Sequence, residues 1–286
     1  MENRQKSAKV LSLSKLLSEG IDSGKIKVPI LPRVAGQVLK LTNNADAEME
    51  DFSRLIHTDQ ALASHVLRIA NSAAFSRGTQ IISLKQAVAR LGMRLLAEIA
   101  VAISVQQQKN FTAKGFEEQQ RLMMRKALIS ATYGKEMART KRRNVEGQFI
   151  CGLLHTVGEP VTLGLIVQIA TVKKLKLTKQ EMDSLIAEFH PTVGKRMTAD
   201  WNLPELIVTT CNYYRNYKSA PNYQIETGMT YLSDIMANWV INEEGDEKDA
   251  IIENETFYEL NFYPDEIDAL LQQKSRVLAI VDEMEI

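Results

Sequence analysis

Apolar residues recur along this chain at helical spacing almost everywhere, and in strict alternation almost nowhere. A period of three to four residues places apolar side chains on one face of an α-helix, whereas a half-buried strand needs a period of two. From Glu48, for example, Met49, Phe52, Leu55 and Ile56 fall on one face of the expected helix. The pattern therefore predicts an all-α protein, and 286 residues are enough to bury a substantial core.

Helix-boundary signals divide the sequence into separate helices. Start signals stand before several apolar stretches: Asp59, Ser83 with Gln86, Thr178 with Glu181, and Pro264. Gly92 suits a left-handed helix end, and the nearly all-apolar stretch that follows it, "MRLLAEIAVAISVQQQ", predicts a buried helix.

The polar stretch from Gln107 to Glu118 is the best candidate for a break between two helical lobes. We expect an N-terminal helix or tail over residues 1–24, an N-terminal lobe over 25–112 and a second helical lobe over 113–241. Residues 242–286 are predicted to form an acidic loop and a C-terminal amphipathic helix. That helix carries an apolar stripe that must be buried, either on its own chain or against a second copy: Ile267, Leu270, Leu271, Val277, Leu278 and Val281.

Charge and composition exclude several classes of protein. With 35 basic and 35 acidic residues, the formal net charge of +0 offers no field to attract nucleic acid or an anionic membrane. The longest apolar run, Val161 to Val172, is too short to span a bilayer, and the N-terminus lacks the apolar region of a secretory signal. Cys151 and Cys211 make no disulfide framework. We therefore expect a cytoplasmic protein with no membrane partner.

The stretch "CGLLHTVGEP" contains the first candidate for chemistry. An apolar helix should end near His155, because Gly158 and Pro160 follow it. From these residues alone, His155 is either a metal ligand or a structural histidine at the end of a buried helix.

Longer stretches add a resemblance. Between Leu31 and Leu96 the chain reads "LPRVAGQVLKL", "IHTDQALASHVLRIANSAAF" and "ISLKQAVARLGMRLL" in that order, and "GLLHTVGEPV", "EFHPTVGKRMTADWNLPELI" and "YLSDIMANWV" follow later. In order and spacing these stretches closely resemble the HDOD family, the output-domain relatives of the HD phosphohydrolases. The resemblance runs from about Leu31 to Val240 and implies a two-lobed all-α protein whose second lobe is HD-like.

The parent HD enzymes use histidines and aspartates, including an adjacent His-Asp pair, to hold one or two divalent ions that activate water against a phosphoester. The resemblance places three candidate metal ligands in this chain: His155, His190 and Asp234. The adjacent pair here reads His155-Thr156, and a neutral hydroxyl neither balances a cation nor bridges two of them well.

Other positions also depart from the parent pattern. Lys126 stands where the parent enzymes place an earlier histidine, so it would repel an ion and could pair with Asp234 instead. Tyr213 and Tyr214 stand where later histidines are expected. From the residues alone, these tyrosines are expected at the polar rim of an amphipathic helix. We therefore predict a vestigial metal site with no bound cofactor, although two histidines and a carboxylate leave a mononuclear site open as the alternative.

The resemblance implies a non-catalytic signalling module that acts by protein interaction, with signalling proteins as partners and no catalytic residue. The alternative is a metal-dependent phosphohydrolase that acts on a nucleotide or cyclic dinucleotide with a divalent ion as cofactor. These two differ in whether the three ligands converge on an ion. A nucleic-acid-binding regulator is disfavoured by the balanced charge.

Overall fold

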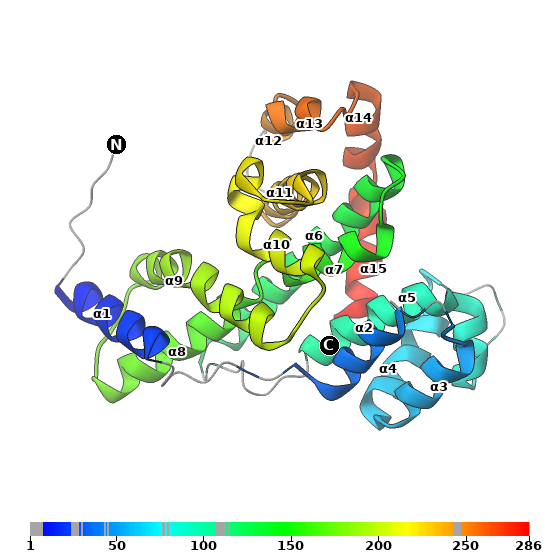
Figure 1. Cartoon of the computed structure of the whole chain (residues 1–286), viewed down its shortest axis with the longest axis horizontal. Helices are drawn as coiled ribbons and strands as arrows, with labels where there is room; N and C mark the ends of the chain where they lie inside the picture. The colour runs from blue at the N-terminus through cyan, green and yellow to red at the C-terminus, as the bar shows by residue number, and fades with distance from the viewer. Residues whose placement is uncertain are drawn as a thin grey trace.

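The computed structural model describes residues 8–23, 29, 31–42, 44, 46–75, 78, 80–106, 113, 115–242 and 247–285. Every regular element in this part of the chain is helical, as the apolar period predicts (Figure 1). The elements are α1 (Ala8–Asp22), α2 (Arg33–Thr42), α3 (Met49–His57), α4 (Gln60–Asn71), α5 (Leu84–Gln106), α6 (Glu117–Thr140), α7 (Val145–Leu154), α8 (Gly158–Val172), α9 (Lys179–Asp200), α10 (Glu205–Tyr213), the 3₁₀ helix η2 (Tyr214–Ser219), α11 (Gln224–Ile241), α12 (Glu247–Ile252), α13 (Glu255–Glu259), α14 (Pro264–Gln272) and α15 (Lys274–Met284).

The helices gather into two lobes. In the N-terminal lobe, α2, α3 and α4 pack around α5 (Figure 1). In the second lobe, α6 packs against both α7 and α11, and α8 packs against α9. The residues between the lobes, 107–112 and 114, lie outside the described residues, as do residues 243–246 of the predicted acidic loop.

Most of the local signals are confirmed. The Asp59 carboxylate accepts a hydrogen bond from the Leu62 amide at 3.0 Å, and Thr178 with Glu181 forms the predicted capping box. Gly92 has φ of 78° and interrupts α5, so the buried segment after it takes a new direction. The expectation for Met49 is wrong, because its side chain is 52% exposed at the start of α3.

The two lobes share one continuous core of buried side chains. Helix α5 contacts α7 and α15, and α15 also contacts α6. At the end of α15, the Glu285 carboxylate pairs with Arg121 and Arg125 of α6, and Gln106 of α5 donates to the Met284 carbonyl at 3.1 Å. The C-terminal segment therefore contacts both lobes and adds to the interactions that hold them together.

The C-terminal apolar stripe is folded onto its own chain. It forms two helices, α14 and α15, which meet at Gln273, where one continuous helix was expected. Leu271 is 5% exposed and Val281 is fully buried, whereas Leu278 is only partly buried. Of the two alternatives left open by the sequence, the structure supports the intramolecular core.

Helix α1 covers part of the second lobe. Its buried face packs on α8 and α9. Lys9 pairs with Glu181 at 2.8 Å, and Arg196 donates to the Ile21 carbonyl at 2.7 Å. The N-terminal helix that was expected within residues 1–24 is thus an integral part of the second lobe's surface.

One stretch of the described residues, Val145–Val172, is long and apolar enough to cross a membrane. In the fold it is two helices, α7 and α8, and 78% of its most apolar window is buried inside the protein. Burial in the core of the second lobe accounts for its composition.

Candidate functional site

The predicted site residues come from four helices of the second lobe. His155 follows the last residue of α7, His190 lies within α9, and Asp234 lies within α11. Lys126 lies on α6, which packs directly against α11. The fold therefore brings together residues that are far apart in the sequence.

His155 and Lys126 converge on one oxygen of Asp234. The His155 Nε2 lies 3.2 Å from Asp234 Oδ1, and the Lys126 Nζ lies 2.8 Å from the same atom. The other ring nitrogen, Nδ1, donates to the Gly152 carbonyl at 2.8 Å. Both ring nitrogens therefore face oxygen atoms, one of the backbone and one of a carboxylate, and these two contacts fix the orientation of the ring.

The environment of Asp234 keeps its carboxylate charged. Burial acts to raise its pKa, but the hydrogen bonds and positive charges of His155 and Lys126 outweigh burial. The pKa of Asp234 is therefore held well below its ordinary value. The result is a largely buried polar cluster in which one carboxylate is shared by the Lys126 ammonium and the His155 ring.

His190 lies near this cluster without bonding to it. Its side chain is 1% exposed, and its Nε2 has no hydrogen-bond partner among the described residues. Burial lowers the pKa of His190 to about 3, and the nearby charges of Arg215 and His155 act in the same direction. His190 is therefore a neutral histidine held beside a cationic group.

Two further residues belong to the site: Glu159, which sequence reasoning missed, and Tyr214, which the resemblance places where a later histidine is expected. Glu159, in the first turn of α8, has its pKa raised by burial and lowered in part by Lys126. Tyr214 packs edge-on against the His155 ring, with centroids 4.7 Å apart, and is 4% exposed. Tyr214 was expected at a polar helix rim, and its burial makes that expectation wrong. Arg215 donates to the Tyr214 hydroxyl at 3.0 Å.

A backbone contact between α8 and α9 sets the position of these groups. A Cβ built on Gly158 would lie 2.1 Å from the His190 carbonyl oxygen and 2.7 Å from the Gly194 nitrogen. Only glycine permits this approach. The contact places the start of α8, and with it Glu159, directly against the turn of α9 that carries His190.

The residues present do not fit a divalent ion of the HD type. A ligating histidine must offer an unprotonated nitrogen to the metal, but the His155 Nε2 faces a carboxylate that also binds an ammonium. Thr156, where the parent enzymes have aspartate, is 4% exposed and supplies no charge. Among the described residues, no three His, Cys, Asp or Glu side chains are grouped so that they could hold a metal.

Comparison with known proteins identifies the fold and the family. The family model described as the HDOD domain matches residues 28–217, which is more than half of the chain. The chain belongs to the HDOD family. Its match begins before α2 and ends within η2, so α1 and the segment after η2 lie outside the HDOD model.

Solved structures share the same fold across almost the whole chain. A candidate metal-dependent phosphohydrolase from Shewanella amazonensis SB2B has a TM-score of 0.72 at 18% identity, covering 96% of this chain and 99% of its own. An HDOD domain protein of unknown function from Geobacter sulfurreducens has a TM-score of 0.71 at 23% identity, covering 96% of this chain and 98% of its own. A candidate signal transduction protein from Marinobacter aquaeolei VT8 has a TM-score of 0.68 at 18% identity, covering 99% of this chain and 68% of its own.

A curated relative is longer than this chain. An uncharacterized protein of Treponema pallidum (strain Nichols) is 23% identical over 202 residues. The match covers 68% of this chain but spans only 39% of that protein.

Proposed function

We propose that this HDOD protein is a non-catalytic regulatory module that acts by binding signalling proteins in the cytoplasm. The observation that carries the proposal is the polar cluster at Asp234. Lys126 supplies the positive charge that a metal ion supplies in an HD enzyme, and it does so from within the chain at 2.8 Å. With Thr156 in place of the bridging aspartate, no pair of ions can be held to activate water.

The regulatory role draws further support from the fold. The site is closely packed, with the Tyr214 ring against His155 and His155 against Asp234, and the Asp234 carboxylate is paired within the chain. Such a core serves a binding module that needs a fixed outer surface and no reactive centre. The name of the Marinobacter relative, a candidate signal transduction protein, agrees with this role.

A metal-dependent phosphohydrolase of nucleotides or cyclic dinucleotides is the second candidate. It is favoured by the placement of His190 and Glu159 near the His155–Asp234 pair, since the Asp234 charge raises the pKa of both groups. The Shewanella relative is named as a candidate enzyme of this class. The two candidates differ in metal binding and in turnover.

We expect the purified protein to carry no stoichiometric divalent ion. Binding would have to displace both the Lys126 ammonium and the His155 ring from Asp234, and the ammonium would then lie unpaired beside a divalent cation. Elemental analysis of protein prepared without chelator, followed by calorimetric titration with Mn²⁺ and Zn²⁺, measures this. One tightly held ion per chain that is lost in His155→Ala would establish the enzyme alternative.

We also expect no phosphoester hydrolysis. p-Nitrophenyl phosphate and bis-p-nitrophenyl phosphate should be hydrolysed no faster with the protein than in buffer that contains the same metal. The expected reason is that Lys126 occupies Asp234 and Thr156 replaces the bridging aspartate, so two ions are not held to activate water. The control is Asp234→Ala carried through the same purification. A rate that persists through repurification and disappears in Asp234→Ala would refute the non-catalytic proposal.

A further inference from the structure

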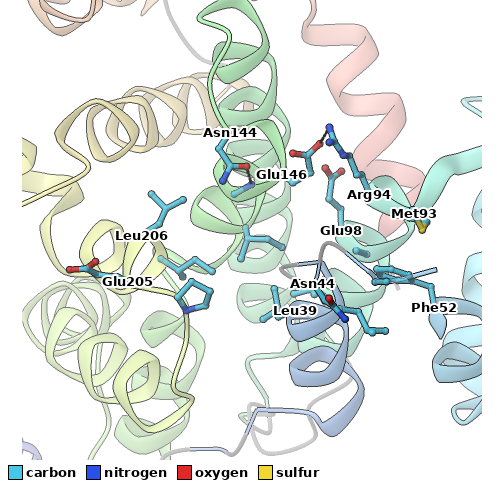
Figure 2. A pocket seen from close by; sticks show the side chains of 18 of the residues that line it. Leu39, Asn44, Phe52, Met93, Arg94, Glu98, Asn144, Glu146, Glu205 and Leu206 are labelled. Carbon is cyan, nitrogen blue, oxygen red and sulfur yellow. Dashed lines mark hydrogen bonds and ion pairs between the residues drawn. The ribbon is translucent and has the colours of Figure 1, made fainter. Parts of the chain in front are cut away.

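A cavity of about 480 Å³ lies between the two lobes, and its lining does not include His155, His190 or Asp234. Figure 2 shows its walls. On one side lie Leu39 of α2, Phe52 of α3, and Met93, Arg94 and Glu98 of α5. On the other lie Asn144 just before α7, Glu146 in the first turn of α7, and Glu205 and Leu206 of α10. We call this cavity the interlobe cleft. Its volume is within the range of small-molecule sites, which often form where two structural units meet.

The floor of the interlobe cleft is apolar. Phe52, Ala97, Val101, Ile150 and Ile207 line it, and each is at most 6% exposed. These side chains come from both lobes, so a molecule on this floor contacts the N-terminal lobe and the second lobe together. An apolar body in the cleft would gain the free energy of leaving water.

The charged groups at the rim already have partners. Arg94 pairs with Glu146 at 3.0 Å, Glu98 pairs with Lys135, and Glu205 accepts from Asn222 at 2.5 Å. An anion would lose its hydration without finding an unpaired cation, because Arg94 is already paired. Glu205 bonds only to a neutral amide, but it is exposed to solvent, so it offers a cation no buried counter-charge.

Two helices begin at the cleft, but they do not make it an anion site. Helix α7 starts after Asn144, whose side-chain oxygen accepts from the Gly147 amide at 2.9 Å, and α10 starts after Pro204. Glu146 and Glu205 stand in the first turns of these helices and offset their positive ends. What remains for a ligand is the apolar floor and uncharged hydrogen-bonding groups such as the Asn144 amide nitrogen.

We infer that the interlobe cleft binds an uncharged, mainly apolar small molecule that carries one or two hydrogen-bonding groups. The ligand contacts both lobes, so its binding stabilises their present arrangement. In the regulatory module proposed above, on which this last step rests, such a ligand is the input that the module senses.

Two dyes with the same aromatic body test the site. N-phenyl-1-naphthylamine is uncharged, and 1-anilinonaphthalene-8-sulfonate adds a sulfonate. The uncharged dye should bind saturably at one site per chain and raise the unfolding temperature. The sulfonate should bind at least about tenfold more weakly, because burial would leave its charge unpaired.

Variants locate the binding. Ala97 lines the cleft, so Ala97→Phe fills it and should weaken binding of the uncharged dye by at least about tenfold. The control, Ala269→Phe, adds the same ring at an exposed site on α14 and should leave dye binding unchanged. Leu206→Asp, at the partly exposed mouth, provides a second blocking variant if Ala97→Phe does not fold. The inference is overturned if the uncharged dye does not saturate, if the sulfonate binds equally well, or if a folded cleft variant binds like the parent. These results are independent of the turnover assay, so the ligand site and the non-catalytic role can fail separately.

Discussion

Replacing Gly158 with alanine should destabilise the second lobe more than any other single methyl group added to α8. The new Cβ would lie 2.1 Å from the His190 carbonyl oxygen, and the contact is backbone, so no side chain can rotate away. Helices α8 and α9 must separate. We expect the free energy of unfolding to fall by about 3 kcal/mol or more, at the upper end of overpacking effects.

The same helix offers a matched control. Gly164 also lies within α8, but a Cβ there would meet no atom within 4 Å. Gly164→Ala should therefore raise the free energy of unfolding by ~0.5–1 kcal/mol, since alanine is the better helix former. Urea denaturation followed by circular dichroism measures both. If the two variants shift stability in the same direction, the close crossing of α8 and α9 is absent from the protein in solution.

The crossing at Gly158 also explains why part of the site was not predictable. In the sequence, Gly158 is expected only to end a helix. Helix α7 does end nearby, at Leu154, but Gly158 is itself the first residue of α8. The close approach of Gly158 to His190 depends on a tertiary contact between α8 and α9, and local sequence patterns do not predict such a contact. Glu159 was missed for this reason, although it follows His155 by four residues in the same motif.

Other features depended on short-range physics or on the family pattern, and these were predictable. Caps such as Asp59 act within a few residues, so the sequence alone specifies them. The Lys126–Asp234 pair joins distant helices and was expected only because the resemblance puts Lys126 nearest the position of an earlier histidine in the parent HD enzymes. The burial of Tyr214 against His155 was not predicted, because the resemblance gives only its position and an amphipathic tyrosine suits a helix rim equally well.

The apolar stripe near the C-terminus shows the limit of periodicity. Its spacing correctly predicted burial of Leu271 and Val281, but helix period continues across Gln273, where α14 ends and α15 begins. The backbone at Gln273 keeps a right-handed conformation, with φ of −78° and ψ of −1°. A break of this kind leaves no glycine or proline in the sequence.

Leu271→Glu is expected to have the second large effect. Leu271 lies on α14, is 5% exposed and belongs to the core that the C-terminal helices share with the rest of the chain. A glutamate there would either bury an unpaired charge or pull α14 away from the body of the protein. We expect the free energy of unfolding to fall by about 3 kcal/mol or more, which is the range of buried-charge substitutions.

The adjacent position supplies the control for charge. Gln272 is exposed, so Gln272→Glu adds the same carboxylate to the same helix and should change stability by less than about 1 kcal/mol, the scale of a charge at a helix end. Thermal unfolding and analytical ultracentrifugation of both variants distinguish core from interface. Loss of folded protein in Leu271→Glu alone confirms the intramolecular core. A folded Leu271→Glu variant that sediments as a smaller species than the parent would instead show that this stripe joins two copies of the chain, because an interface can lose its apolar contact without unfolding either partner.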